Sequence, residues 1–522
     1  MSLLGRPESR LPSAQHGGFR VAGVQRRGVL ALGAAATLGL PLAARAQSSA
    51  VASVALTAEA AAQDVRVLRR ALTALHPALT KYRTQAEIET ALARFDARGQ
   101  AARSPGEMLL AAAEMAASVR CGHTWANVLN QQRGARGALL DGRDKLPLKM
   151  TLVQGRWLVL ASAAPAVRAG DEIVSVDSVP AAVMVERLLP YLRADGSSDG
   201  KRLRQLGHDR FDYSQLDMLW PLLSPPTAGV NLLGVRRGGV GATQEIRVET
   251  TTLAARDAAL AALAVKGIAA KSDAWSLRIE GDIARLVLPT FSLWRSKFDW
   301  KRFIADSFAE LNARRVPALV IDIRDNEGGD GAIGGELLSY LVREPLRFSS
   351  DQSISAYERA PYALARYLDT WDYGFFDRTG LVDRVTEGTA AGLWRVRSRV
   401  AREQTIEPVA GRYNGRVFLL VGPENSSATY QFANLTQQAR AATLVGQRTG
   451  GNRRGLNGGE LCWVVLPNSG AAVDIPLLAA GYSADTPDAS VLPDIAVARS
   501  FEQMASGRDA EFEAVLKALG RA

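Results

Sequence analysis

The sequence predicts an α/β protein with a helical N-terminal region, a β-rich middle part and a C-terminal half in which strands and helices alternate. Three observations predict this. Capping residues followed by apolar positions at helical spacing occur before residue 123, and short alternating runs fill residues 145–190. From residue 275 onward, buried apolar runs alternate with amphipathic stretches. A chain of 522 residues is long enough for several domains and a large core.

The first 46 residues are predicted to be an export signal. Arg26 and Arg27 precede an uncharged stretch that ends in Ala44-Arg45-Ala46, a small-x-small site that predicts cleavage before Gln47. The uncharged stretch is short and contains Gly and Pro, so no stable membrane span is expected after cleavage. The twin arginine favours the Tat route, and the Sec route stays open. We expect the mature chain to be periplasmic or secreted.

Helix starts are marked clearly in the region that follows. Thr84 and Ser104 each stand three residues before a glutamate, which predicts two capping boxes, and Pro105 suits the first helical position. An earlier helix is expected to begin near Thr57 and to end before Pro77. The third helix is expected to end near 121–122, with Gly122 as its left-handed residue, and residues 123–128 alternate like a strand.

The middle part predicts short strands, and the C-terminal half predicts alternating elements. In the middle part the expected strands are 148–153, 157–160, 169–177, 230–235 and 245–251, with a loop at 195–200 and a linker at 253–271. In the C-terminal half the expected strands are 284–288, 318–323, 417–421, 443–446, 460–466 and 471–475, and the expected helices are 298–311, 332–342 and 428–441.

Charge and cysteine content exclude several classes of function. The net charge is +10, but residues 1–46 carry +5 of it, and the other residues hold 57 basic and 52 acidic side chains. No basic stripe interleaved with aromatic residues is present, so nucleic acid is not an expected partner. Cys121 and Cys462 are the only cysteines, too few for a disulfide framework or a four-thiolate metal site. Two buried thiols are expected, one long-range disulfide stays open, and no metal or cofactor is predicted.

Two segments carry the chemistry. Apolar runs end abruptly at polar corners, residues 322–329 and 422–427, and helical sequence follows each corner. Such corners present backbone N–H groups and a hydroxyl at the carboxyl ends of strands, which a serine nucleophile requires. Ser427 is the candidate nucleophile. Ser426 competes with it, and a helix N-cap is the ordinary alternative for either serine.

Several ordered motifs resemble those of the tail-specific (C-terminal processing) and tricorn-like serine peptidases. The resemblance covers residues 275–500 and rests on the motifs Asp322-Ile323-Arg324-Asp325-Asn326-Glu327-Gly328-Gly329, Ser427-Ala428-Thr429-Tyr430, Leu444-Val445-Gly446-Gln447-Arg448-Thr449-Gly450-Gly451 and Leu492-Pro493-Asp494-Ile495. It implies a crotonase-like (ClpP-like) spiral ββα core. It also implies an oxyanion hole made by the backbone amides of Gly328, Gly329 and Ala428.

The catalytic base follows from a departure within this resemblance. The tail-specific branch has a lysine downstream of its serine, but Asn452 stands there, and an amide cannot accept the serine proton. The tricorn-like branch takes a histidine from before its PDZ-like domain, and His123 matches that order. Gly122 stands where that branch has a serine. We therefore expect His123 to be the base, with a pKa near the ordinary imidazole value of about 6.5.

An orienting carboxylate and a peptide-binding domain are implied less directly. The family places a glutamate near residues 482–493, where this chain offers Asp488 or Asp485. We favour Asp488, although either aspartate can be an Asx-turn residue. Residues 169–177 resemble the Gly-Asp-x-Ile strand of PDZ domains, with Ser178 in the place of the glycine that often follows.

The expected organisation is an export signal (1–46), a helical region carrying the base (47–140), a PDZ-like β domain with a linker (141–270), a peptidase core (271–500) and a C-terminal helix (501–522). The expected function is an exported serine endopeptidase acting on unfolded or C-terminal polypeptide segments. One alternative is an inactive peptide-binding module of the same fold. A remote one is a penicillin-binding or β-lactamase-like acyl transferase, from Ser198-x-x-Lys201 and Arg448-Thr449-Gly450, which the expected loop position of Ser198 disfavours.

Overall fold

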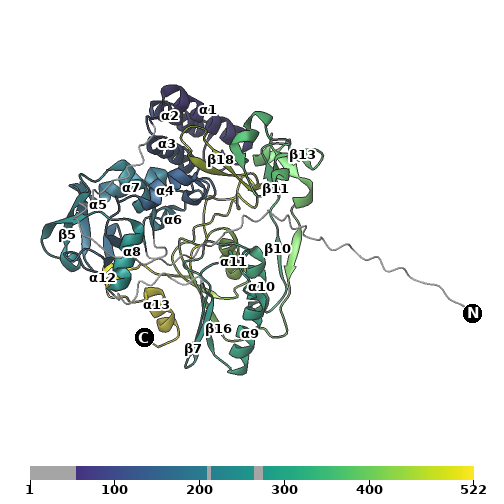
Figure 1. Ribbon diagram of the computed structural model, residues 1–522. Coiled ribbons are helices and arrows are strands. Elements are labelled where there is room, and N and C mark those ends of the chain that lie inside the picture. The colour runs from purple at the N-terminus through teal and green to yellow at the C-terminus, as the bar shows by residue number, and fades with distance from the viewer. Residues whose placement is uncertain (1–54, 209–212, 264–273, 522) are drawn as a thin grey trace, which may run out of the picture. The chain divides into compact units, whose positions relative to one another are not determined.

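The N-terminal helices begin where the sequence predicts. The computed structural model describes residues 55–208, 213–263 and 274–521, so the predicted export signal over residues 1–46 lies outside the described residues. Helices α1 (Ala58–Leu75), α2 (Gln85–Ala101) and α3 (Pro105–Ser118) follow the N-caps Thr57, Thr84 and Ser104. Figure 1 shows these three helices as the darkest ribbons. Their buried faces pack against strands β18 (Leu461–Val465) and β19 (Ala472–Pro476) of the C-terminal half.

The segment after α3 differs from the prediction. The helix ends at Ser118, and the left-handed residue is Arg120 (φ 59°) rather than Gly122. Residues 123–128 form no strand. Trp125 makes a single bridge to Asp474, and a short 3-10 helix, η1 (Val128–Asn130), follows. Contacts with residues distant in sequence hold this segment, so local alternation was a misleading signal here.

The middle part contains an antiparallel sheet with strand order β1-β2-β3-β5-β6. The strands are β1 (Leu148–Val153), β2 (Arg156–Ser162), β3 (Glu172–Val176), β4 (Val179–Pro180), which pairs with β3, β5 (Val230–Arg236) and β6 (Thr243–Glu249). The helices of this region are α4 (Arg133–Asp141), α5 (Ala181–Leu188), α6 (Asp199–Arg204), α7 (Gln215–Leu223) and α8 (Leu253–Ala262). Helix α6 begins inside the predicted loop, and α8 occupies the described part of the predicted linker.

The C-terminal half is built on a second sheet, with order β21-β17-β16-β9-β8-β7. Its strands are β7 (Ser276–Glu280), β8 (Ile283–Val287), β9 (Ala318–Asp322), β16 (Arg416–Val421), β17 (Thr443–Gly446) and β21 (Ile495–Ala496), and its helices are α9 (Trp300–Ala313), α10 (Gly331–Leu341) and α11 (Ser427–Gln438). All neighbouring strands are parallel except β7 and β8. Figure 1 shows α9, α10 and α11 beside this sheet.

The register of this sheet brings the two corners together. Leu420 of β16 lies opposite Asp322 of β9, so both strands end at the same edge. The strands are buried and apolar because helices and other elements cover both faces. The two polar corners predicted from sequence therefore leave the sheet side by side.

Smaller sheets complete the C-terminal half. Strand β12 (Leu368–Asp369) pairs with β18, β10 (Leu346–Ser349) pairs with β15 (Glu403–Ile406), and a four-stranded sheet contains β13 (Val382–Arg384), β14 (Trp394–Val396), β11 (Ser353–Ser355) and β20 (Ala479–Ala480). The predicted C-terminal helix over 501–522 is two helices, α12 (Phe501–Ala505) and α13 (Ala510–Ala518). Gly507, with φ 72°, lies in the break between them.

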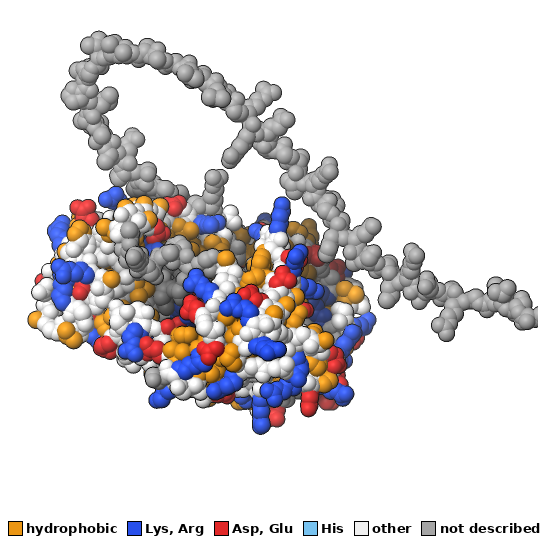
Figure 2. Space-filling view, turned by 90° about the horizontal axis from the view of Figure 1, so that it is seen from below, with side chains coloured by type: hydrophobic (Ala, Val, Ile, Leu, Met, Phe, Trp, Pro, Cys, Tyr) orange, Lys and Arg blue, Asp and Glu red, His pale blue; other side chains and the backbone are white. Residues whose placement is uncertain are grey.

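Two bulk properties of the sequence have structural counterparts. Cys121 and Cys462 are both buried free thiols, which confirms the expectation of two thiols and removes the disulfide. On the face shown in Figure 2, blue and red side chains are interspersed rather than gathered by sign. Within the described ranges, no helix has both the length and the apolar character needed to cross a bilayer.

Candidate active site

Ser427 is held in a strained conformation at the start of α11. Its φ of 52° lies in the left-handed region, which a serine adopts at a cost of the order of 1 kcal/mol or more. The residue is half-buried and follows strand β16 by one short loop, residues 422–426, which we call the serine loop. Such strain persists only where surrounding contacts determine the backbone.

Asn425 supplies those contacts. Its Nδ2 donates to the carbonyl oxygens of Ile323 and Asn326, the latter at 3.0 Å, and its Oδ1 accepts the Gly422 N–H at 2.8 Å. Its own carbonyl accepts the N–H groups of Gly450 and Gly451 at 2.8 and 3.0 Å. One buried side chain thus ties the serine loop to the corner after β9.

The corner after β9, residues 326–329, lies directly against Ser427. We call it the glycine corner. A Cβ on Gly328 would lie 2.8 Å from the Ser427 Cβ and 3.0 Å from the Ala428 nitrogen, and a Cβ on Gly329 would lie 2.1 Å from the Phe291 carbonyl carbon. Both glycines have φ above 100°, so a side chain there is excluded by conformation as well as by space.

The amides of these residues are not equivalent. The Gly328 N–H donates to Asn326 Oδ1 at 2.9 Å. Within the described parts of the chain, the amides of Gly329 and Ala428 make no backbone or side-chain hydrogen bond. The Ala428 amide is one of the N-terminal helix donors that have no intrahelical partner, and the helix dipole favours negative charge there. Two of the three predicted oxyanion donors are therefore available.

The two competing serines have different surroundings. Ser426 is 5% exposed, and its Oγ accepts from Lys201 Nζ at 2.6 Å and donates to the Glu327 carbonyl at 3.1 Å. The Ser427 hydroxyl makes no hydrogen bond with any described residue. The serine with a hydroxyl available for reaction is therefore Ser427.

His123 lies in the turn after Cys121, among charged side chains from three segments. Burial lowers the pKa of its imidazole to about 4. The Asp195 carboxylate raises that pKa, the cations Arg193 and Lys201 lower it, and Glu327 raises it. The Nδ1 atom is buried and has no hydrogen-bond partner among the described residues. No hydrogen bond joins His123 to Ser427 directly. Lys201 and Glu327, whose charges act on His123, contact Ser426, the residue before Ser427.

The other described histidines have structural partners. His76 Nε2 bonds to Thr124 Oγ1 at 2.8 Å, and burial lowers the pKa of this imidazole to about 3. His208 Nε2 bonds to Asp217 Oδ2 at 2.8 Å, and the His208 N–H bonds to Met150 of strand β1. Both ring nitrogens of His76 and of His208 are therefore taken up by structural hydrogen bonds.

Asp195 is a residue of this site that the sequence did not indicate. It is 3% exposed, and its Oδ1 accepts the Gly122 N–H at 2.8 Å. Arg193 donates to the Gly122 carbonyl, so the segment 193–195 holds the peptide units on both sides of Gly122. Asp195 stands in a Gly/Ser/Asp cluster, which in sequence is indistinguishable from an ordinary loop.

Asp488 lies near this segment with its carboxylate turned to other groups. Its Oδ1 accepts from Asn452 Nδ2 at 2.6 Å and from the Ser197 N–H at 2.9 Å. Asp485, the alternative, is exposed. The structure thus brings together Asn452, which stands at the position of the tail-specific lysine, and the predicted carboxylate Asp488, with Asp195 nearer to His123.

The Ser-x-x-Lys motif has a different role from the acyl-transferase interpretation. Ser198 is the N-cap of α6, and its Oγ bonds to Ser490 Oγ and to the Gly451 carbonyl, each at 3.1 Å. Lys201 contacts Ser426 instead. Ser198 itself lies in the predicted loop, which ends where α6 begins at Asp199. The motif still lacks the Ser–Lys contact that a penicillin-binding or β-lactamase-like site requires.

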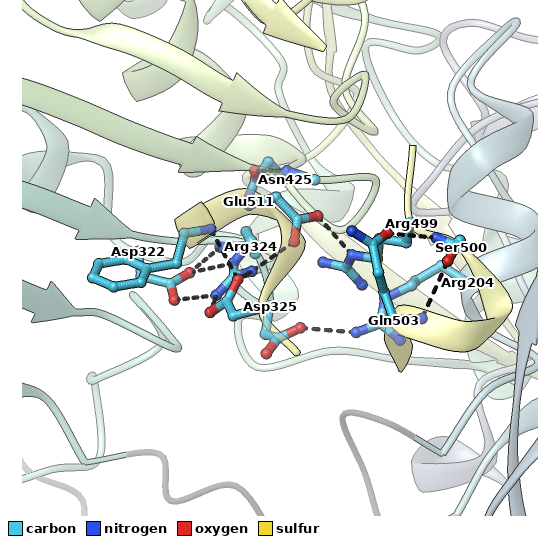
Figure 3. A network of polar contacts seen from close by, with 12 residues as sticks. Arg204, Asp322, Arg324, Asp325, Asn425, Arg499, Ser500, Gln503 and Glu511 are labelled. Carbon is cyan, nitrogen blue, oxygen red and sulfur yellow. Dashed lines mark hydrogen bonds and ion pairs between the residues drawn. The ribbon is translucent and has the colours of Figure 1, made fainter. Parts of the chain in front are cut away.

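A network of polar contacts surrounds Arg324 and Asp325, the two residues just before the glycine corner (Figure 3). Arg324 donates to Asp322 at 2.8 and 3.0 Å, to Asp509 at 2.7 and 2.9 Å, and to Glu511 at 2.9 Å. Burial alone would lower the pKa of the Arg324 guanidinium, but the Asp322 and Asp509 carboxylates hold it well above its usual value. Arg204 of α6 reaches the same region through Asp325 at 2.8 Å.

Comparisons with known proteins agree with this geometry. The model of peptidase family S41 matches residues 282–495. The structure of mature CPAF complexed with lactacystin is 16% identical, with a TM-score of 0.57, over 89% of this chain and 98% of that chain. The crystal structure of mature CPAF is also 16% identical, with a TM-score of 0.54, over 89% and 97%. At this identity the similarity shows a shared fold. No curated protein sequence matches the chain.

Proposed function

We propose that this chain, whose residues 282–495 match the model of peptidase family S41, is an endopeptidase of the tail-specific and tricorn-like kind, with Ser427 as nucleophile and His123 as base. The observation that carries the proposal is the left-handed Ser427, pressed against Gly328 at the start of a helix. This arrangement exposes a hydroxyl beside unpaired amides, which is what acyl transfer needs. The absence of a lysine at Asn452 supports the tricorn-like Ser–His branch over Ser–Lys.

In the proposed reaction, Ser427 Oγ attacks the carbonyl carbon of a peptide bond while His123 accepts the hydroxyl proton. The negative charge that develops on the carbonyl oxygen is stabilised by the Gly329 and Ala428 amides and by the dipole of α11. His123 then gives the proton to the departing amine, and water hydrolyses the acyl-enzyme. Catalytic hydrogen bonds often close only in the substrate complex, which fits the lack of a direct His123–Ser427 bond.

We assign the two carboxylates different positions in this site. Asp195 favours the protonated form of His123 and fixes the backbone just before it. Asp488, the orienting carboxylate expected from sequence, accepts a hydrogen bond from the Ser197 amide. It therefore acts on His123 indirectly, by holding the segment that carries Asp195. Each carboxylate accepts a hydrogen bond from a backbone amide, Gly122 for Asp195 and Ser197 for Asp488. These bonds fix the position of the chain around His123, in addition to any effect on the pKa of the imidazole.

The finer features of fold and substrate are part of the same proposal. The parallel sheet with α9, α10 and α11 fits a crotonase-like ββα core, and the sheet β1–β6 fits a PDZ-like domain.

A cavity of about 370 Å³ lies beside edge strand β1. It is lined by residues 151–155, Gly200, Leu203 and Arg204, and it reaches Pro423 of the serine loop. An extended peptide paired with such an edge would lead toward Ser427. The substrate we propose is an unfolded or C-terminal segment, met after export to the periplasm or cell exterior.

Labelling with a fluorophosphonate tests the activity. Wild-type protein should be labelled once, on Ser427, because the probe mimics the tetrahedral intermediate and requires both nucleophile and oxyanion hole. Ser427→Ala should take no label, whereas Ser426→Ala should still be labelled on Ser427. Mass spectrometry of the labelled peptide identifies the site. Identical absence of label in wild type and Ser427→Ala would favour the inactive peptide-binding module.

A second experiment tests recognition of chain ends. One unstructured peptide is prepared with a free and with an amidated C-terminus, and the values of kcat/KM for cleavage are compared. If backbone amides of the β domain capture a terminal carboxylate, the free acid should be cleaved at least about tenfold faster, the ratio for 1.4 kcal/mol. Equal values would remove carboxylate capture and leave the peptidase activity standing.

A further inference from the structure

Lys201 is a buried cation that the reaction described above does not use. The side chain is 2% exposed, although α6, which carries it, belongs to the segment between strands β4 and β5. Its Nζ lies 2.6 Å from Ser426 Oγ and 3.3 Å from Glu327 Oε1. Burial of a lysine costs free energy unless its charge is paired and hydrogen-bonded, and both partners here belong to the proposed site.

The two partners belong to the two loops that must meet. Ser426 directly precedes the nucleophile Ser427, and Glu327 directly precedes Gly328 of the glycine corner. Ser426 Oγ also donates to the Glu327 carbonyl at 3.1 Å. Lys201 therefore closes a triangle of contacts that joins the serine loop to the glycine corner from a third segment of the chain.

We infer that Lys201 is a positioning residue of the peptidase site, which holds Ser427 against the glycine corner through Ser426 and Glu327 and keeps a fixed positive charge beside His123. The inference rests on the proposed function. It differs from the family's serine–lysine chemistry, because Lys201 does not contact the Ser427 hydroxyl and takes no proton from it. The ammonium is paired with the Glu327 carboxylate, so it acts as a charge and a hydrogen-bond donor.

The fixed charge gives the inference a signature that a purely structural lysine lacks. The charged groups that act on His123 are Asp195 and Arg193 from the segment before α6, Lys201 from α6 and Glu327 from the glycine corner. The two cations disfavour a protonated imidazole, and the two carboxylates favour it. Removal of the Lys201 charge should therefore raise the pKa of His123, and removal of the Glu327 charge should lower it.

The experiment is the rate of fluorophosphonate labelling as a function of pH, for wild type and three variants at this pair. Lys201→Met should be labelled roughly ten- to a hundredfold more slowly at neutral pH. The acid limb, which is the rise of the labelling rate with pH that follows the pKa of His123, should move up by roughly one pH unit in this variant. Lys201→Arg keeps the charge and should keep the limb in place, even if its bulk slows labelling. Glu327→Gln should move the limb down.

Lys145→Met is the matched control. Lys145 is 1% exposed and paired with Asp144 at 2.6 Å. The Lys145→Met variant therefore loses a comparable buried charge outside the proposed peptidase site. Its labelling rate and acid limb should equal those of wild type. Circular dichroism verifies that each variant is folded. If Lys201→Met does not fold, the limbs of Lys201→Arg and Glu327→Gln still decide.

The possible outcomes distinguish a failure of the Lys201 inference from a failure of the proposed peptidase function. Wild-type labelling with no change of rate or limb in folded Lys201→Met would overturn the positioning role and leave the peptidase intact. A slower rate with an unmoved limb in Lys201→Met, together with an unmoved limb in Glu327→Gln, would reduce Lys201 to a structural contact and also overturn the inference. A wild type that takes no label would remove the proposed function, and the inference with it.

Discussion

His123→Ala should lower kcat/KM for peptide cleavage by about a thousandfold or more while leaving the fold intact. The reason is that the variant has no group to accept the Ser427 proton, since Asn452 cannot act as a base and Lys201 is held by Ser426 and Glu327. The measurement is the hydrolysis of an unstructured peptide, with circular dichroism as the check on folding. Arg453→Ala, an exposed change in the loop where the tail-specific branch has its lysine, is the control and should be nearly neutral. Loss of activity in Arg453→Ala but not in His123→Ala would refute the assignment of the base.

The pH profile of the wild type should follow the same imidazole. Only the neutral form accepts a proton, so kcat/KM should increase as the pH rises through about 4 and then stay level to neutrality. From sequence alone we expected this rise near 6.5. The difference arises because burial and the neighbouring cations disfavour the charged ring. A rise centred near 6.5 would show that His123 is solvated in the working enzyme.

Arg324→Met should lower the free energy of unfolding by about 3–5 kcal/mol. The substitution leaves Asp322, Asp509 and Glu511 without the guanidinium that bonds to all three. Arg285 still contacts Asp322 and Asp509, and Arg499 still contacts Glu511, so the charges are only partly compensated. Urea unfolding followed by intrinsic fluorescence measures the loss. The loss arises because Asp322 and Glu511 are buried, and a buried charge is costly when one of its partners is removed.

Arg508→Met is the matched control for this prediction. Arg508 bonds to Glu513 at 2.7 and 2.9 Å in the same C-terminal segment, but its side chain is 60% exposed. Exposed ion pairs contribute little, so the change should cost no more than about 1 kcal/mol. Similar losses in the two variants would mean that the Arg324 network does not stabilise the fold.

Most elements of the fold could be predicted because the signals that define them are local. Thr57, Thr84 and Ser104 are helix caps, and the buried strands β9 and β16 are continuous apolar runs bounded by polar residues. The errors arose where distant contacts prevail. Residues 123–128 alternate like a strand but are held by the 193–195 segment and by Asp474, and α6 lies in a stretch rich in turn-forming residues.

The site divides in the same way. Ser427, Gly328, Gly329 and Ala428 lie in motifs whose spacing reflects the corners of one sheet, so the sequence indicated them together and the structure brings them together. Asp195 and Lys201 reach the site by folding from another part of the chain, and no local pattern marks them. Lys201 was noticed, but in a motif that pairs it with the wrong serine, because sequence spacing cannot tell which hydroxyl a side chain will meet.

The origin of the Arg324 network has a consequence for when the site can be complete during synthesis. The carboxylates of Asp509 and Glu511 follow the nucleophile in the chain, and chains fold from the N-terminus as they are made. A nascent polypeptide that already displays Ser427 therefore still has a glycine corner whose supporting arginine lacks two of its counter-ions. In a chain made in this order, the proposed oxyanion site at the glycine corner gains its full set of supporting ion pairs only after residues 509–511 have been made.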